Sequence, residues 1–123
     1  MIDTKIWLIL FADEKGISFK RLFLYSRTKN VDDETALHIA CKNGHLAVAK
    51  ALINVEIKSN HDILNSKDRR GNTALHLCVL NGNYELAKLL VREGADLNSK
   101  NNAEKTPKEE AIEMNHLAVL ALL

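Results

Sequence analysis

One ten-residue pattern, which occurs twice, decides the fold of this chain. Thr73-Ala74-Leu75-His76-Leu77-Cys78-Val79-Leu80-Asn81-Gly82 repeats the layout of Thr35-Ala36-Leu37-His38-Ile39-Ala40-Cys41-Lys42-Asn43-Gly44, and an apolar run follows each segment. A third copy begins at Thr106-Pro107. The threonines are spaced by 38 and then by 33 residues, so the first unit holds five more residues than the second. A fixed period of this length indicates a repeat architecture.

The start of each copy carries signals for the first turn of a helix. A threonine before an apolar run is a good N-cap, because its hydroxyl accepts from a free backbone N–H. Thr106-Pro107-Lys108-Glu109 adds proline at the first helical position and glutamate at the third. That spacing predicts a capping box at Thr106.

Helix ends can be located in the same way. Gly44 and Gly82 are placed to end the first helix of their units, with Asn115 in the third, because these residues tolerate the left-handed conformation. Gly94 ends the second helix of the middle unit. Each unit is therefore two short antiparallel helices and an outward loop. Such helices persist only by stacking on neighbouring units, which predicts a solenoid.

This pattern resembles the ankyrin repeat, which has a 33-residue period and the signature T-P-L-H-x-A. The resemblance covers about residues 30–123 and is best in the middle copy, at Asp68, Gly71, Thr73, Leu75, His76, Gly82, Leu86, Leu90, Gly94-Ala95-Asp96 and Asn98. Departures are Ala36 and Ala74 for the usual proline, Asp33 and Glu104 for the usual tip glycine, and Lys108-Glu109 for Leu-His. The resemblance implies an all-α fold of stacked helix pairs with outward loops.

We expect a single domain over residues 1–123. It divides into a degenerate N-terminal cap repeat (1–29), a repeat with an insertion (30–67), a repeat (68–100) and a C-terminal cap repeat (101–123). Apolar residues in the first segment predict helices at about 4–13 and 17–26. A short helical arm outside the repeat array is the alternative for this segment. The polar first helix of the last segment is typical of a cap whose outer face meets water.

The five extra residues of the first unit fall at about 56–61. This stretch contains the polar run Lys58-Ser59-Asn60-His61, which suits a longer return loop in solvent. Such a loop is either inert or an extension of the binding surface, and the inert reading is favoured.

Composition excludes several classes of function. The formal net charge is +1, so the chain does not have the excess of basic residues that is typical of a nucleic-acid-binding protein. The apolar run at residues 6–12 is too short to span a bilayer. Two cysteines in apolar stretches form no disulfide framework. We therefore expect an intracellular protein, cytoplasmic or nuclear (or in a host cytosol, if it is a secreted effector), without nucleic acid or membrane insertion, and monomeric alone.

Histidine and cysteine residues raise the question of a metal site. His38, Cys41 and His45 lie close in sequence, as do His76 and Cys78, but a structural zinc site needs four converging ligands. The family resemblance implies instead that His38 and His76 bond the neighbouring threonine and nearby backbone. No nucleophile with a base and no glycine-rich phosphate loop is found. We expect no metal, no cofactor and no enzymatic activity.

Ankyrin proteins usually bind partners with loop tips and first-helix surfaces, so the resemblance implies a concave binding face. The candidate partner-binding residues are Asp32, Glu34, Lys42, Asn43, Arg69, Arg70, Asn72, Leu80, Asn81, Lys100, Asn102, Lys105 and Met114. The first tip, Asp32-Asp33-Glu34, is acidic, and the second, Lys67-Asp68-Arg69-Arg70, is mostly basic. Opposed charges would steer a complementary partner into register. Arg69 and Arg70 are suited to a carboxylate or phosphate.

The sequence predicts a protein–protein interaction module acting as an adaptor, an inhibitor or an effector. One alternative is a targeting or recognition fragment of a larger multidomain enzyme or channel. A second is a metal-dependent or hydrolytic activity of its own, for which no set of residues with assignable roles is found.

Overall fold

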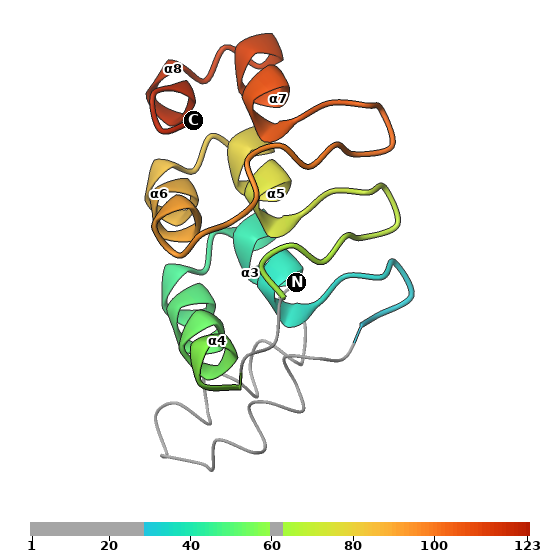
Figure 1. The fold of residues 1–123 in the computed structure, drawn as a ribbon, viewed down its shortest axis with the longest axis vertical. Coiled ribbons are helices and arrows are strands. Elements are labelled where there is room, and N and C mark those ends of the chain that lie inside the picture. Colours follow the sequence, from blue (N-terminus) through green and yellow to red (C-terminus); the bar gives the residue numbers. More distant parts are fainter. Residues whose placement is uncertain (1–28, 60–62) are drawn as a thin grey trace.

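The chain stacks pairs of short helices, with an extended finger joining each pair to the next (Figure 1). The computed structural model describes residues 29–59 and 63–123, with side chains at 29–54 and 63–123. Its helices are α3 (Ala36–Asn43), α4 (Leu46–Ser59), α5 (Ala74–Leu80), α6 (Tyr84–Arg92), α7 (Pro107–Glu113) and α8 (Leu117–Leu120). The all-α fold is confirmed, whereas the helices predicted at 4–13 and 17–26 lie outside the described residues.

The helices form two layers. Helix α3 packs against α5 and α5 against α7 to form an inner layer, from which the fingers project; α4, α6 and α8 form the outer layer (Figure 1). Each helix is 4 to 9 residues long except α4. Helices this short gain their stability from packing on neighbours, so the stack is the folding unit.

Threonine caps begin the inner helices, as the sequence predicts. Thr35, Thr73 and Thr106 accept from the backbone N–H three residues on, at 3.3, 3.4 and 3.2 Å. The capping box predicted at Thr106 is only half formed, because the Glu109 carboxylate accepts from the Thr106 hydroxyl and not from its N–H. The complete boxes are those of α3 and α5, where histidine takes the place of glutamate.

Left-handed residues end the first helix of each pair. Gly44 and Gly82 have φ of 75° and 64°, and Asn115 takes the same place with φ 59°. At Gly82 an added Cβ would also lie 3.1 Å from the imidazole of His116, which belongs to the next helix pair. Both the short turn and the close stacking of repeats thus require glycine at position 82.

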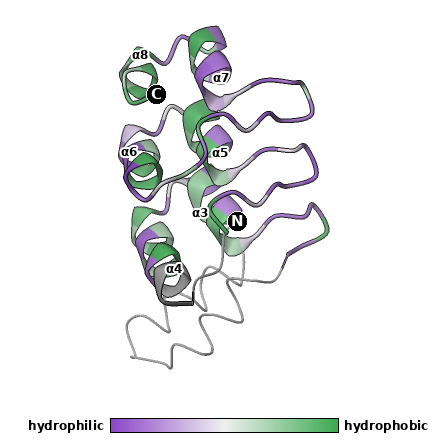
Figure 2. Ribbon diagram, viewed as in Figure 1, coloured by the Kyte–Doolittle hydropathy of each residue, from purple (hydrophilic) through white to green (hydrophobic). Residues whose placement is uncertain are grey.

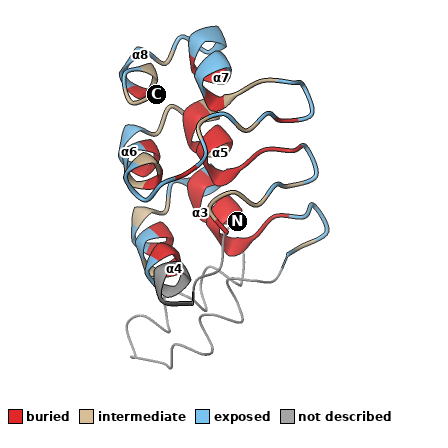
Figure 3. Cartoon of the chain, viewed as in Figure 1, coloured by how far each residue is buried: buried red, intermediate tan, exposed pale blue. Residues whose placement is uncertain are grey.

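The core is aliphatic and lies between the layers and between successive helix pairs (Figures 2 and 3). Its largest enclosed side chains include Leu37, Leu52, Leu75 and Leu86. Both cysteines are free and fully buried, as expected. A hydrogen bond with the Cys78 thiol, together with burial, raises the pKa of Cys41 well above its usual value, so this thiol stays protonated at neutral pH.

The predicted loop insertion is wrong for its first residues. Helix α4 has 14 residues and continues through Ser59, whereas α6 has 9. Glu56 to Ser59 therefore prolong the outer helix, and residues 60–62 lie outside the described residues. The polar composition of this segment suggested a loop, but lysine and glutamate are also good helix formers.

Candidate protein-interaction surface

The extended loops that precede α3, α5 and α7 are called the first, second and third fingers, and all three contain the same kind of backbone turn. The side-chain oxygens of Asn30, Asp68 and Asn101 each accept the backbone N–H groups two and four residues on, at 2.9 to 3.1 Å. These Asx-type bonds hold a tight turn that positions the tip side chains. The last residue of each turn, Asp33, Gly71 or Glu104, has positive φ. The non-glycine tips anticipated at positions 33 and 104 thus adopt the glycine-type conformation.

Neighbouring fingers are hydrogen-bonded to one another along the stack. The N–H of Arg69 donates to the carbonyl of Asp32, and the N–H of Asn102 donates to the carbonyl of Arg70, both at 3.0 Å. The ammonium groups of Lys29 and Lys67 donate to the carbonyls of Lys67 and Lys100, respectively. The fingers therefore form one continuous surface rather than three independent loops.

Two buried histidines, His38 of α3 and His76 of α5, each join their helix to the next finger. The His38 Nδ1 accepts from the Thr35 N–H at 3.1 Å, so its Nε2 carries the proton and donates to the Asn72 carbonyl at 3.0 Å. The His76 Nε2 contacts the Lys105 carbonyl in the same way at 2.9 Å. Burial lowers the pKa of both imidazoles below 6.5, which favours this neutral form. The hydrogen bonds expected of these two histidines, with the neighbouring threonine and with nearby backbone, are confirmed.

A hollow of about 410 Å³ lies between the first two fingers and the inner helices. Its lining residues are Asp32, Glu34, Lys42, Asp68, Arg69, Arg70, Asn72, Leu77 and Leu80. Leu77 and Leu80 belong to α5 and give the hollow its apolar patch. It therefore combines a small apolar surface with charged walls, a composition suited to a protruding segment of another protein.

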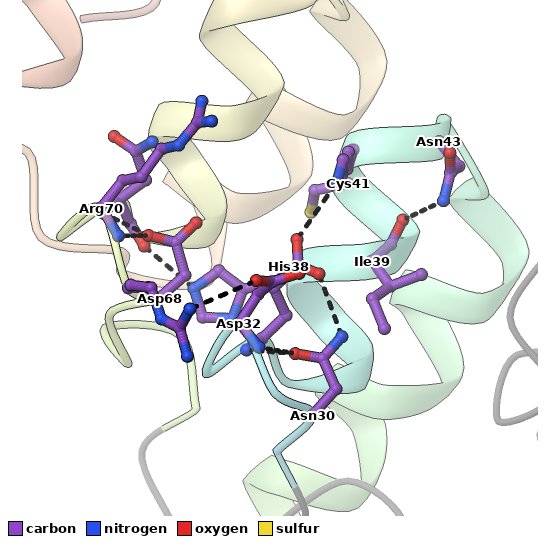
Figure 4. Close-up of polar contacts among 12 residues, drawn as sticks. Asn30, Asp32, His38, Ile39, Cys41, Asn43, Asp68 and Arg70 are labelled. Carbon is purple, nitrogen blue, oxygen red and sulfur yellow. Dashed lines mark hydrogen bonds and ion pairs between the residues drawn. The ribbon is translucent and has the colours of Figure 1, made fainter.

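The carboxylates of this hollow are largely satisfied inside the protein. Glu34 is buried and accepts from the amide of Asn30 at 3.0 Å, and the ammonium of Lys42 lies 3.5 Å away. Asp68 accepts two backbone N–H groups of its own turn (Figure 4). Asp32 is exposed and lies 3.9 Å from Arg69. Only this last carboxylate is readily reached by a partner.

The two arginines of the second finger differ in their contacts. Arg69 donates to the Val31 carbonyl and faces Asp32, so it serves the contact between fingers. The exposed guanidinium of Arg70 has no hydrogen bond or ion pair with the part of the chain that the structure describes, although its backbone N–H bonds Asp68 (Figure 4). Arg70 is thus a cation left available at the hollow.

Seven of the sequence-predicted residues line this hollow, but two of them do so from buried positions. Glu34 and Asn72 are 7% and 6% exposed, so they contribute to the wall and not to a protruding contact. Sequence reasoning left Asp68 and Leu77 out of the candidate set. The position of Asp68, equivalent to Asn30 and Asn101, was a usable signal, since all three precede a finger tip.

The remaining candidates have other surroundings. Asn43 and Asn81 bond backbone carbonyls of α3, and Asn102 bonds the carbonyl of Arg69. Lys105 forms an ion pair with Glu113, and that hydrogen bond raises the pKa of Lys105. Lys100 and Met114 are exposed. The set therefore does not gather at one point, and seven of its thirteen residues surround the hollow.

A buried polar network was not visible in the sequence. The Asn101 amide donates to the side-chain oxygens of both Asn72 and Glu110, at 3.0 and 2.9 Å. All three residues are buried, so the network joins the second and third fingers to α7. Among residues 29–59 and 63–123, no group of three His, Cys, Asp or Glu side chains is arranged to hold a metal ion.

Comparisons with known proteins fit this architecture. The sequence matches the family described as ankyrin repeats (3 copies) over residues 8–101 and 57–123. It is 38% identical over 88 residues to a transient receptor potential cation channel subfamily A member 1 homolog from Caenorhabditis elegans. That alignment covers 72% of this chain and 7% of the channel homolog. None of the helices in the described part of the chain is both long and apolar enough to cross a membrane. With its repeat period, histidine brackets and finger stack, the chain belongs to the ankyrin-repeat family, whose repeats are non-enzymatic modules that bind other proteins.

Proposed function

We propose that this protein is an interaction module that binds a partner protein through the fingers and inner helices of its concave face. The hollow between the first two fingers carries this proposal, because seven of its nine lining residues belong to the candidate binding set. Its walls come from two repeats, which the Arg69–Asp32 backbone bond holds in register. A partner segment would meet a preorganised surface and would cost little ordering of the fingers.

Arg70 gives the hollow its preference. Its guanidinium lacks an internal partner among the described residues. The ammonium of Lys42, which also lines the hollow, lies 3.5 Å from the Glu34 carboxylate. Leu77 and Leu80 of α5 line the same hollow. A partner segment with a carboxylate beside an aliphatic side chain would pair with Arg70 and cover the leucines. Adaptor, inhibitor and effector roles are all compatible with binding of this kind.

The experiment is affinity capture from a cell lysate followed by mass spectrometry. Wild type is compared with Arg70→Glu, with Arg92→Glu on the outer helix α6 as a control that has the same charge change on an exposed residue. We expect proteins that wild type and Arg92→Glu capture and Arg70→Glu loses. Equal capture by all three folded proteins would show that the hollow is not the binding site.

A second candidate function is that of a recognition segment within a larger channel-type protein. The similarity to the channel homolog, which extends over 7% of that protein, supports it. An antibody against residues 63–123 would detect the native protein on an immunoblot. A product far heavier than 13.8 kDa supports this candidate, whereas a product near 13.8 kDa supports the stand-alone module.

A further inference from the structure

A small groove lies on the outer layer of helices, away from the fingers (Figure 1). It has a volume of about 110 Å³ and is formed where α4 packs beside α6. Its lining residues are Leu46, Lys50, Glu85, Lys88, Leu89 and Arg92. None of them lines the hollow between the first two fingers, so the protein presents a second concave surface.

Helical spacing brings the lining residues of this groove together. Leu46 and Lys50 are four residues apart on α4, and the four residues from α6 fall at positions i, i+3, i+4 and i+7 counted from Glu85. Residues at these intervals share one face of a helix. Leu46 and Leu89 are half-buried and pack against the core, whereas the three basic residues are exposed. The groove therefore has an apolar floor beside basic side chains.

The protein does not neutralise these basic side chains. Within residues 29–59 and 63–123, Lys50 and Arg92 have neither an ion pair nor a side-chain hydrogen bond. The ammonium of Lys88 lies 5.9 Å from the centre of the Tyr84 ring, a contact that gives it no anionic partner. Glu85 is the one carboxylate among the lining residues. The groove thus has an excess of positive charge, although the formal net charge of the whole chain is only +1.

The corresponding positions between α6 and α8 do not carry this charge. Lys88 follows Lys50 by 38 residues and takes its place there. The residues 33 positions after Glu85 and Lys88 are Ala118 and Ala121. The second junction of outer helices therefore forms without a charged residue at either of these positions. Packing of the helices does not require the cations of the first groove, which leaves them available for another role.

The size and charge pattern of the groove restrict what can bind there. Its volume is below the range of about 300–1,000 Å³ that is usual for small-molecule sites, so it suits a single side chain of a larger partner. Lys88 and Arg92 are about one helical turn apart. Glu85 lies among the cations and would repel a compact, doubly charged phosphate. Separate carboxylates along a peptide fit this pattern better than one phosphate does.

We propose that the groove between α4 and α6 is a second docking surface, which binds an acidic peptide segment of another protein. Carboxylates of this segment pair with Lys50, Lys88 and Arg92. One of its aliphatic side chains lies against Leu46 and Leu89. A segment bound here leaves the hollow accessible, so the chain joins two partners, one on each face. Because the two sites share no residue, Arg92→Glu remains a control for the hollow.

The test is a titration of the whole, isotopically labelled chain with a synthetic peptide of glutamates interrupted by leucines, followed by NMR spectroscopy. We expect saturable shifts of the backbone amides of α4 and α6 around Lys50 and Arg92. The hollow also suits carboxylates, and binding there would shift the amides of residues 69–72 instead, so the two sites are read separately. If the peptide causes no saturable shift in α4 and α6, the proposal is wrong, whatever happens at the fingers.

Matched variants separate the groove from net charge. Lys50→Glu should raise the dissociation constant measured at the α6 amides by about tenfold, because a repulsion replaces an attraction. Arg92→Glu is the second groove variant. Lys108→Glu makes the same charge change at an exposed position of α7 and should leave the constant unchanged. Equal weakening by Lys50→Glu and Lys108→Glu would overturn the proposal, since the peptide would then respond to net charge alone.

Two further probes test the chemistry of the occupant. A peptide with serines in place of the leucines should bind more weakly, because it leaves the apolar floor of the groove uncovered. Equal binding of the two peptides would remove the aliphatic contact from the proposal. Vesicles containing phosphatidylserine test a membrane as the occupant. Binding of these vesicles that Lys50→Glu abolishes, together with no response to the acidic peptide, would assign the groove to a lipid surface and overturn the proposal.

Discussion

The second and third repeats have the same helices but are joined to their surroundings in different ways. In the second repeat, His76 closes the cap of α5 and also reaches the Lys105 carbonyl of the next finger. In the third, Glu109 takes the equivalent place and bonds only the Thr106 hydroxyl. At the finger tips, Gly71 and Glu104 both have positive φ, but Gly71 also lies close against Asn102 of the next finger. A helix cap can thus be built from local contacts, but the register between repeats depends on residues that contact both their own repeat and the next one.

The largest effect is expected from His76→Ala. The substitution removes a buried imidazole together with its hydrogen bonds to the Thr73 N–H and to the Lys105 carbonyl, which keeps only its bond from the Asn101 N–H. Loss of buried volume and of two buried bonds should lower the unfolding free energy by about 3 kcal/mol. Urea unfolding followed by circular dichroism measures it. Glu109→Ala, the matched change in the third repeat, should cost only about 1 kcal/mol. Equal losses would show that the contact of His76 with the next finger adds no stability.

The finger tips provide the next test. Gly71 has φ of 77°, and a Cβ there would lie 2.5 Å from the side-chain oxygen and 2.8 Å from the backbone nitrogen of Asn102. Gly71→Ala should therefore cost about 2 kcal/mol, since left-handed strain is added to a clash with backbone. Glu104→Ala should be nearly neutral, because that position already holds a Cβ at φ 62°. Equal losses in urea unfolding would show that the Asn102 contact is not decisive.

Acid should weaken the histidine-bracketed junctions. Burial lowers the pKa of His38 and His76 below 6.5, so the unfolded chain takes up protons before the folded one does. The stability from these groups is complete above pH 6.5 and is lost as the pH falls through their folded pKa values. Unfolding free energies measured from pH 8 to pH 5 should decline for wild type and decline less for His76→Gln. Identical slopes would mean that His76 does not titrate differently on folding.

The smallest change is a gain. Glu104→Gly should raise the unfolding free energy by roughly 0.5–1 kcal/mol, because glycine relieves the left-handed strain at φ 62° but enlarges the entropy of the unfolded chain. Ala103→Gly is the control, since its φ is not positive and the entropic cost alone remains. A gain at both positions, or at neither, would argue against strain at the third tip.

The sequence predicted the parts of the fold that follow from local chemistry. Thr35, Thr73 and Thr106 cap helices, and Gly44, Gly82 and Asn115 end them, because these roles depend on a residue and its near neighbours. It could not predict that Arg69 is tied to the first finger while Arg70 is available. That division depends on which side chain faces a finger 38 residues away, and the two arginines are adjacent in sequence.

Long-range polar contacts escaped prediction for the same reason. Asn101 joins Asn72 to Glu110 across two repeats, and none of these residue types signals burial. Glu34 and Asn72 were predicted on the binding face from their positions in the repeat, yet both are buried. The helical part of the insertion was missed because the composition of a polar helix and that of a polar loop are alike.

The buried thiols have a kinetic consequence. Cys41 and Cys78 meet between the first two helix pairs and are inaccessible to solvent, and the raised pKa of Cys41 keeps that thiol protonated at neutral pH. Alkylation by a thiol reagent requires a thiolate in contact with solvent, so neither can react until these two repeats separate. At high reagent concentration, the labelling rate becomes the rate at which this one junction opens, measured in the native protein without a probe attached.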